Sequence, residues 1–151
     1  MQRAATLLLA GALAGGLTSA LAGCSADDAA RGSLSQSAGT AAATARSAGL
    51  VLGLNENDRL IGTVLDTGLS DAADSLAQEA QTVATMTARG GIGARRDSVL
   101  ADIRAAQDAV TSAQRAVAAG RDAGRALDPQ RRELDRLAVE LDTASKRLES
   151  R

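Results

Sequence analysis

The chain has no phenylalanine, tyrosine or tryptophan among its 151 residues, and this absence limits the kind of core that it can build. Aromatic rings bury more apolar area than other side chains do, so a core without them consists of aliphatic residues and alanine. Alanine accounts for 28 of the residues from Cys24 onward, which favours helices that pack closely. The same absence removes the stacking surfaces that bind bases, so we expect no nucleic-acid partner.

Apolar residues recur at intervals of three and four, which predicts amphipathic helices over residues 37–54, 58–88, 96–119 and 129–149. The stripes of the second, third and fourth helices are Ile61, Leu65, Leu69, Ala72, Leu76, Ala80, Val83 and Thr87; Val99, Ile103, Ala106, Val110, Ala113 and Val117; and Leu134, Leu137, Leu141, Ala144 and Leu148. The stripe of the third helix, from Val99 to Val117, has the heptad spacing of a coiled coil. The predicted fold class is all-α, as a small up-and-down helical bundle or a long helical hairpin.

The boundaries of these helices follow from glycine, proline and short polar residues. Arg89 to Gly93 contains three glycines and is predicted to be a flexible connector, and Gly120 to Leu127 is predicted to be a loop. Asp58 and Asp128 are the expected N-caps, with Pro129 in the first turn of the last helix.

The first 23 residues have the order of an export signal. A positive start, Met1 to Arg3, precedes the uncharged apolar stretch Ala4 to Leu21, which ends in small residues. The sequence Leu21-Ala22-Gly23-Cys24 resembles the lipobox of bacterial lipoproteins at all four positions. The resemblance implies that a signal peptidase recognises Leu21, Ala22 and Gly23, that residues 1–23 are removed, and that Cys24 carries diacylglycerol with fatty acyl chains such as palmitate. Two acyl chains suffice for stable anchoring, which predicts a location on the extracytoplasmic face of the cell membrane.

Three other interpretations of this segment stay open. Ala20-Leu21-Ala22 also fits an A-x-A cleavage site, which would release a soluble secreted protein. Residues 4–23 are nearly long enough to remain as a transmembrane helix. The third interpretation is a cytosolic protein in which this pattern occurs by chance.

After the signal, residues 24–36 are mostly small and polar, and we expect the lipidated Cys24 to be followed by a flexible tether. Residues 37–151 then form the helical domain. Its charge is uneven, because residues 24–88 contain three arginines and eight acids, whereas residues 89–151 contain thirteen basic residues and ten acids. The favoured interpretation is that acidic and basic helices face each other. The alternative is that the arginine-rich half contacts anionic headgroups or an anionic wall polymer.

The motifs that suggest chemistry are weak. Gly91-Ile92-Gly93 lacks the third glycine and the preceding strand of a dinucleotide site. The pairs Asp71 with Asp74 and Asp135 with Asp142 are expected on solvated helix faces, which does not favour acid–base catalysis. Without histidine, and with Cys24 committed to lipid, we expect no metal site, no cofactor and no enzymatic activity.

The stretch Ala42 to Met86 is similar to small actinobacterial lipoproteins of unassigned function, and this resemblance implies location and helicity alone. Short envelope lipoproteins that are linked to the cell wall end in lysine, whereas this sequence ends Leu148-Glu149-Ser150-Arg151, which argues against wall attachment.

The expected function is that of a lipid-anchored envelope protein whose helices present an interaction surface to a protein partner or to a second copy. The alternative is a carrier or sensor of a small apolar or lipidic ligand, held in a cavity lined by Leu50, Leu54, Leu65 and Val99.

Overall fold

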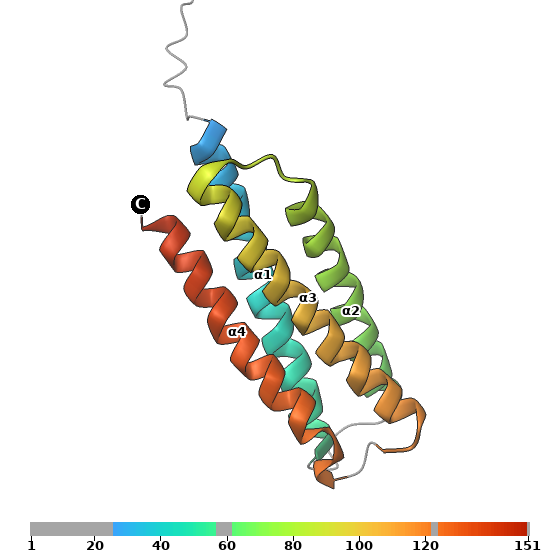
Figure 1. The fold of residues 1–151 in the computed structure, drawn as a ribbon. Helices are drawn as coiled ribbons and strands as arrows, with labels where there is room; N and C mark the ends of the chain where they lie inside the picture. The colour runs from blue at the N-terminus through green and yellow to red at the C-terminus, as the bar shows by residue number, and fades with distance from the viewer. Residues whose placement is uncertain (1–25, 57–61, 122–123, 151) are drawn as a thin grey trace, which may run out of the picture.

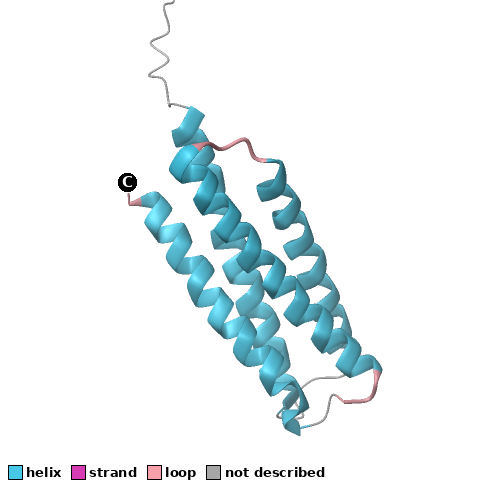
Figure 2. Cartoon of the chain, viewed as in Figure 1, coloured by secondary structure: helices cyan, strands magenta, loops and turns pink. Residues whose placement is uncertain are grey.

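The computed structural model describes residues 26–56, 62–121 and 124–150, and four long helices account for most of them (Figure 1). Helix α1 spans Ala26–Glu56, α2 spans Gly62–Thr85, α3 spans Gly90–Ala118 and α4 spans Asp128–Glu149; the short 3-10 helix η1 spans Gly124–Leu127. No strand occurs in these ranges (Figure 2). The predicted all-α class is confirmed, in the form of an up-and-down bundle.

Successive helices run in opposite directions and pack as a closed set of four. Helix α1 packs most extensively against α4, and α2 packs against α3, while α1–α2 and α3–α4 contacts complete the ring. The starts of α1 and α3 therefore lie at the same end of the bundle as the end of α4 (Figure 1).

The core consists of the predicted stripes together with α1. Buried members of the three stripes are Leu65, Leu69, Ala72, Leu76, Ala80, Val83, Val99, Ile103, Ala106, Val110, Ala113, Leu134, Leu137, Leu141 and Leu148. Val117 and Ala144 pack at the edge of this core, whereas Thr87 is exposed beyond the end of α2. Ile61 lies outside the described residues. The three- and four-residue periods thus located the buried faces of three helices correctly.

The flexible tether predicted for residues 24–36 is wrong from residue 26 onward, because α1 begins at Ala26 instead of at residue 37. Leu34 and Ala38 are completely buried, and Ser35 and Ser37 are nearly so. Small side chains on this face permit close packing against α4, and their burial joins the segment to the bundle.

The connector predicted at Arg89 to Gly93 is also mostly helical. Helix α3 begins at Gly90, not at residue 96, and Ile92 in its first turn is buried. Gly90 adopts a φ of 54°, a conformation that glycine reaches without strain, so the chain can turn sharply into the helix there.

Several other boundaries differ from the predictions. Helix α2 ends at Thr85 instead of residue 88, and Asp58 lies outside the described residues. The Asp128 side chain does not act as an N-cap, since Asp128 is already helical and follows η1, although proline does occupy the first turn of α4 as predicted. Gly120 ends α3 with a φ of 67°, the left-handed conformation common after helix C-termini.

Candidate functional site

The residues of the predicted lipidation signal, Leu21, Ala22, Gly23 and Cys24, lie outside the described residues. What the structure adds is their distance along the chain from the bundle. Helix α1 starts at Ala26, so Cys24 precedes the folded body by only two residues.

Five arginines gather at the end of the bundle where α1 starts, and we call this region the arginine end. Its members come from α1, from the α2–α3 connection and from α3 and α4: Arg31, Arg89, Arg95, Arg96 and Arg147. Two of them are neutralised locally. Arg31 lies 2.9 Å from an Asp28 oxygen, and Arg96 lies 2.7 Å from an Asp97 oxygen.

Arg96 also helps to build this end of the bundle. Its Nη1 donates a hydrogen bond of 3.1 Å to the backbone carbonyl of Met86, ten residues earlier. This bond connects α3 to the first residue after α2, at the start of the α2–α3 connection. The role of Arg96 is therefore structural, and its charge is shared with Asp97.

The other three members, Arg89, Arg95 and Arg147, have no ion pair with any carboxylate in the described part of the chain. Helix α3 adds to the positive potential here, because its first turn contains no acidic residue and no side chain caps its start. Asp27 and Glu149 supply the nearby negative charges that are not in described ion pairs. An arginine without a carboxylate partner can bind another oxyanion, and its planar fork matches the geometry of phosphate as well as that of carboxylate.

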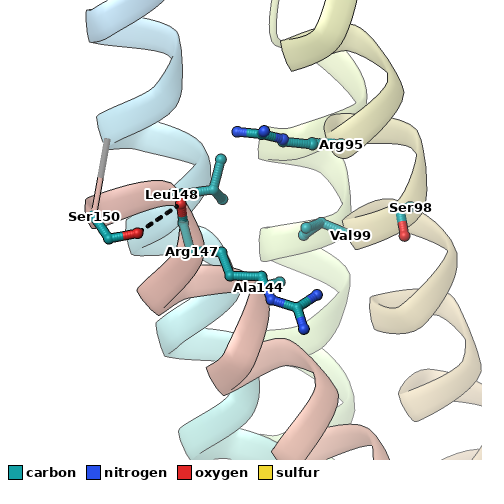
Figure 3. Close-up of a pocket in the computed structure, with 7 residues that line it drawn as sticks. All are labelled: Arg95, Ser98, Val99, Ala144, Arg147, Leu148 and Ser150. Carbon is teal, nitrogen blue, oxygen red and sulfur yellow. Dashed lines mark hydrogen bonds between the residues drawn. The ribbon is translucent and has the colours of Figure 1, made fainter.

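A hollow of about 520 Å³ lies between the start of α3 and the end of α4. Arg95, Ser98 and Val99 line it from α3, and Ala144, Arg147, Leu148 and Ser150 line it from the other side. Figure 3 shows Arg95 extending from α3 toward Leu148 and Arg147 extending from α4 toward α3. The hollow thus combines two guanidinium groups with an apolar floor.

Two shallower hollows occupy the same end of the molecule. One is lined by Arg31, Arg89 and Arg95, together with Asp27 and the first residues of α3. The other is lined by Arg31, Ser35 and Leu148 together with the carboxylates of Asp28 and Glu149. The Nε of Arg31 is buried and has no hydrogen-bond partner in the described structure. All three hollows therefore border the arginine end, and each contains at least one arginine.

The carboxylates that suggested catalytic pairs lie on the bundle surface. Asp142 lies 2.7 Å from Lys146 and 3.4 Å from Arg46, and the hydrogen bond from Lys146 lowers its pKa. Asp135 lies 3.6 Å from Arg131 on its own helix, and Asp71 and Asp74 are exposed on α2. None of the four is buried, as the sequence predicted.

Asp102 is the acidic residue whose position the sequence did not reveal. It is partly buried on α3, and its burial and the nearby Glu140 of α4 raise its pKa, while Arg136 opposes this change. The pairing of α3 with α4 brings Asp102 and Glu140 together, and no local pattern in either helix indicates it.

Few ion pairs connect the helices to one another. Of the ion pairs between described residues, the one that joins two helices is Arg46 with Asp142, across α1 and α4. The others connect residues within one helix, at separations of one, three or four. The helices of the acidic half do face those of the basic half, α1 against α4 and α2 against α3. A single described ion pair joins them, however, so buried aliphatic seams contribute more to the pairing than charge does.

The four residues proposed to line an internal ligand cavity do not come together. Leu50 and Leu54 are 68% and 42% exposed near the end of α1, whereas Leu65 is completely buried. Val99 lies in the first third of α3 and borders the hollow with Arg95 and Arg147. The predicted cavity residues are therefore incorrect as a set.

No described helix combines the length and the hydropathy needed to cross a bilayer. Within the same residues, no three acidic, cysteine or histidine side chains cluster as metal ligands do. Comparisons with protein-family models, curated proteins and solved structures find no match to this chain.

Proposed function

We propose that this chain is a bacterial envelope lipoprotein, anchored through lipid on Cys24 on the outer side of the cytoplasmic membrane, whose helical body is an interaction module and not an enzyme. The observation that carries the proposal is the sequence Leu21-Ala22-Gly23-Cys24 directly after an apolar export signal. Thioether-linked diacylglycerol at that cysteine would give two acyl chains, enough for stable residence in a membrane.

Exposed apolar side chains support the role of an interaction module. Among the described residues, the large apolar side chains that are exposed belong to Leu50, Leu54, Val64 and Val139. Leu50 and Leu54 are one helical turn apart on α1, so they lie on the same face. A pair of this kind gives a partner helix or a second copy an apolar contact to bury.

Mass spectrometry of the protein purified from membranes of a bacterium that expresses the full gene tests the anchor. We expect a mature N-terminus at Cys24 with the added mass of diacylglycerol. The variant Cys24→Ala should lack the added lipid mass and should retain the uncleaved signal peptide, residues 1–23. The control variant Ser33→Ala should behave like the parent protein. An N-terminus at Gly23 would indicate A-x-A cleavage and a secreted protein, and would overturn the proposal.

A carrier of a lipidic ligand is the second candidate, because the hollow between α3 and α4 combines Arg95 and Arg147 with the apolar Val99 and Leu148. A carrier should bind a lysophospholipid in solution with one-to-one stoichiometry. An interaction module should instead form specific crosslinks in membranes, which the double variant Leu50→Ser, Leu54→Ser would abolish.

A further inference from the structure

Because α1 starts early in the sequence, the helical bundle can lie only a short distance from Cys24. One residue, Ser25, lies between Cys24 and Ala26, so Ala26 is two positions after Cys24, and a fully extended chain spans at most about 3.6 Å per residue. If Cys24 carries lipid, the start of α1 lies within roughly 7 Å of the anchored sulfur-bearing residue. A tether of thirteen residues would have allowed several nanometres.

The end of the bundle nearest the anchor is the arginine end. The start of α1 lies there together with the start of α3 and the end of α4 (Figure 1). Arg89, Arg95 and Arg147 thus lie on the end of the body that the anchor must hold near the bilayer, and they have no carboxylate partner in the described residues.

We propose that the arginine end lies against the bilayer and that Arg89, Arg95 and Arg147 bind the phosphates of anionic lipid headgroups. This inference rests on the proposed lipid anchor and adds the orientation of the body and the class of lipid that it contacts. The hollow between Arg95 and Arg147 has an apolar floor at Val99 and Leu148, which suits a phosphate attached to a glycerol backbone.

The arginine end differs from the opposite end in its distance from the anchor, because both ends contain arginines without described ion pairs. Each arginine near an anionic surface contributes about 1 kcal/mol, a factor of roughly five in affinity. Arg115, Arg121 and Arg125 also lack described ion pairs, but they lie near the end of α3 and in the connection to α4, at the far end of the bundle. A helix of 22 residues is about 33 Å long, which exceeds the screening length of about 8 Å at physiological salt.

The two arginine sets provide a control within one molecule. Lipidated protein is placed in phosphatidylcholine vesicles, with or without about one third phosphatidylglycerol, and its arginines are modified with phenylglyoxal and quantified by mass spectrometry. We expect phosphatidylglycerol to slow the modification of Arg89, Arg95 and Arg147 at least fivefold and to leave Arg115, Arg121 and Arg125 unchanged. Sodium chloride at 1 M should remove the difference, because it shortens the screening length to about 3 Å.

Each other outcome is informative. Equal rates at both ends, with the lipid mass present on Cys24, would overturn the orientation and leave the anchor in place. Protection by inorganic phosphate on phosphatidylcholine vesicles alone would indicate a free-anion site, and protection by a soluble lysophospholipid without vesicles would indicate a carrier; either result overturns the inference. Absence of lipid on Cys24 in the same spectra would overturn both the anchor and the inference.

Discussion

Ser35 of α1 and Ser145 of α4 exchange hydrogen bonds across the bundle, each hydroxyl donating to the backbone carbonyl of the other residue. The Ser35 Oγ lies 3.1 Å from the Ser145 carbonyl oxygen, and the Ser145 Oγ lies 2.9 Å from that of Ser35. Both residues are buried, and Ser35 also lies 3.2 Å from a Glu149 carboxylate oxygen. This reciprocal pair holds α4 against α1 near the arginine end.

Removing either hydroxyl should weaken the bundle more than removing an exposed one. We expect Ser35→Ala and Ser145→Ala each to lower the free energy of unfolding by about 1 kcal/mol, because each removes a buried hydrogen bond to the backbone carbonyl of the other helix. The double variant should cost less than the sum of the two, since the hydroxyls also contact each other at 3.1 Å. Urea unfolding measures all three, with the exposed Ser33→Ala as control; strict additivity would contradict the reciprocal arrangement.

Leu34 tests whether residues 26–36 belong to the folded body. Its side chain is completely buried in α1, so Leu34→Ala should cost about 2–5 kcal/mol of unfolding free energy. Leu50→Ala on the same helix removes the same atoms from a side chain that is 68% exposed, and it should change stability by less than about 0.5 kcal/mol. If the two variants unfolded at the same urea concentration, the start of α1 would be a tether after all.

Sequence periodicity located the buried faces of α2, α3 and α4 because each carries large aliphatic residues at regular intervals. It missed the first part of α1 because the buried face there consists of alanine and serine around Leu34, and the helix has little contrast between its faces. It missed the start of α3 because Gly90, Gly91 and Gly93 disfavour a helix locally, while the burial of Ile92 compensates for their cost. Tertiary packing determines where α1 and α3 begin, and the residues at these two boundaries do not by themselves indicate that packing.

The arginine end illustrates the same limit. The excess of arginine in the second half of the chain was visible in the sequence, and so was its interruption by acids. Arg31 and Arg96 bind acids within their own helices, whereas Arg95 and Arg147 come from different helices and line one hollow only because α3 packs against α4. Arg95 and Arg147 are about fifty residues apart in the sequence, and only the fold brings them to the same hollow.

Gly32 and Gly68 should respond in opposite ways to substitution by alanine. A Cβ at Gly32 would meet nothing within 4 Å, so Gly32→Ala should stabilise the protein by about 0.5–1 kcal/mol through helix propensity. A Cβ at Gly68 would lie 3.2 Å from Val51 Cγ2, so Gly68→Ala should be the less stable of the two by more than about 1 kcal/mol. Thermal unfolding compares them, and Val51→Ala in the Gly68→Ala background should recover part of the loss. Equal melting temperatures for the two single variants would show that α1 and α2 are not in close contact there.

Asp102 should make stability depend on pH in a direction opposite to that of an ion-paired acid. Burial and the neighbouring Glu140 raise the pKa of Asp102 in the folded state above its usual value near 3.8. The folded state therefore binds a proton more tightly than the unfolded state does, and ionised Asp102 destabilises the fold. This penalty is absent below pH 3.8, grows as the pH rises toward the raised pKa, and is complete above it.

Asp102→Asn should consequently be more stable than the parent at pH 7, by a few tenths of a kcal/mol because the site is partly exposed to solvent. The advantage should shrink as the pH falls through the raised pKa and should be absent below pH 3.8, where the parent carboxyl is protonated in both the folded and the unfolded state. Urea unfolding at both pH values measures the difference, with the exposed Asp108→Asn on the same helix as control. Glu140→Gln should move the pKa of Asp102, followed by NMR, back toward its usual value, because it removes the negative charge that faces Asp102 across α3 and α4. A pKa that did not change in this variant would leave burial as the whole cause and would show that the two carboxylates do not interact.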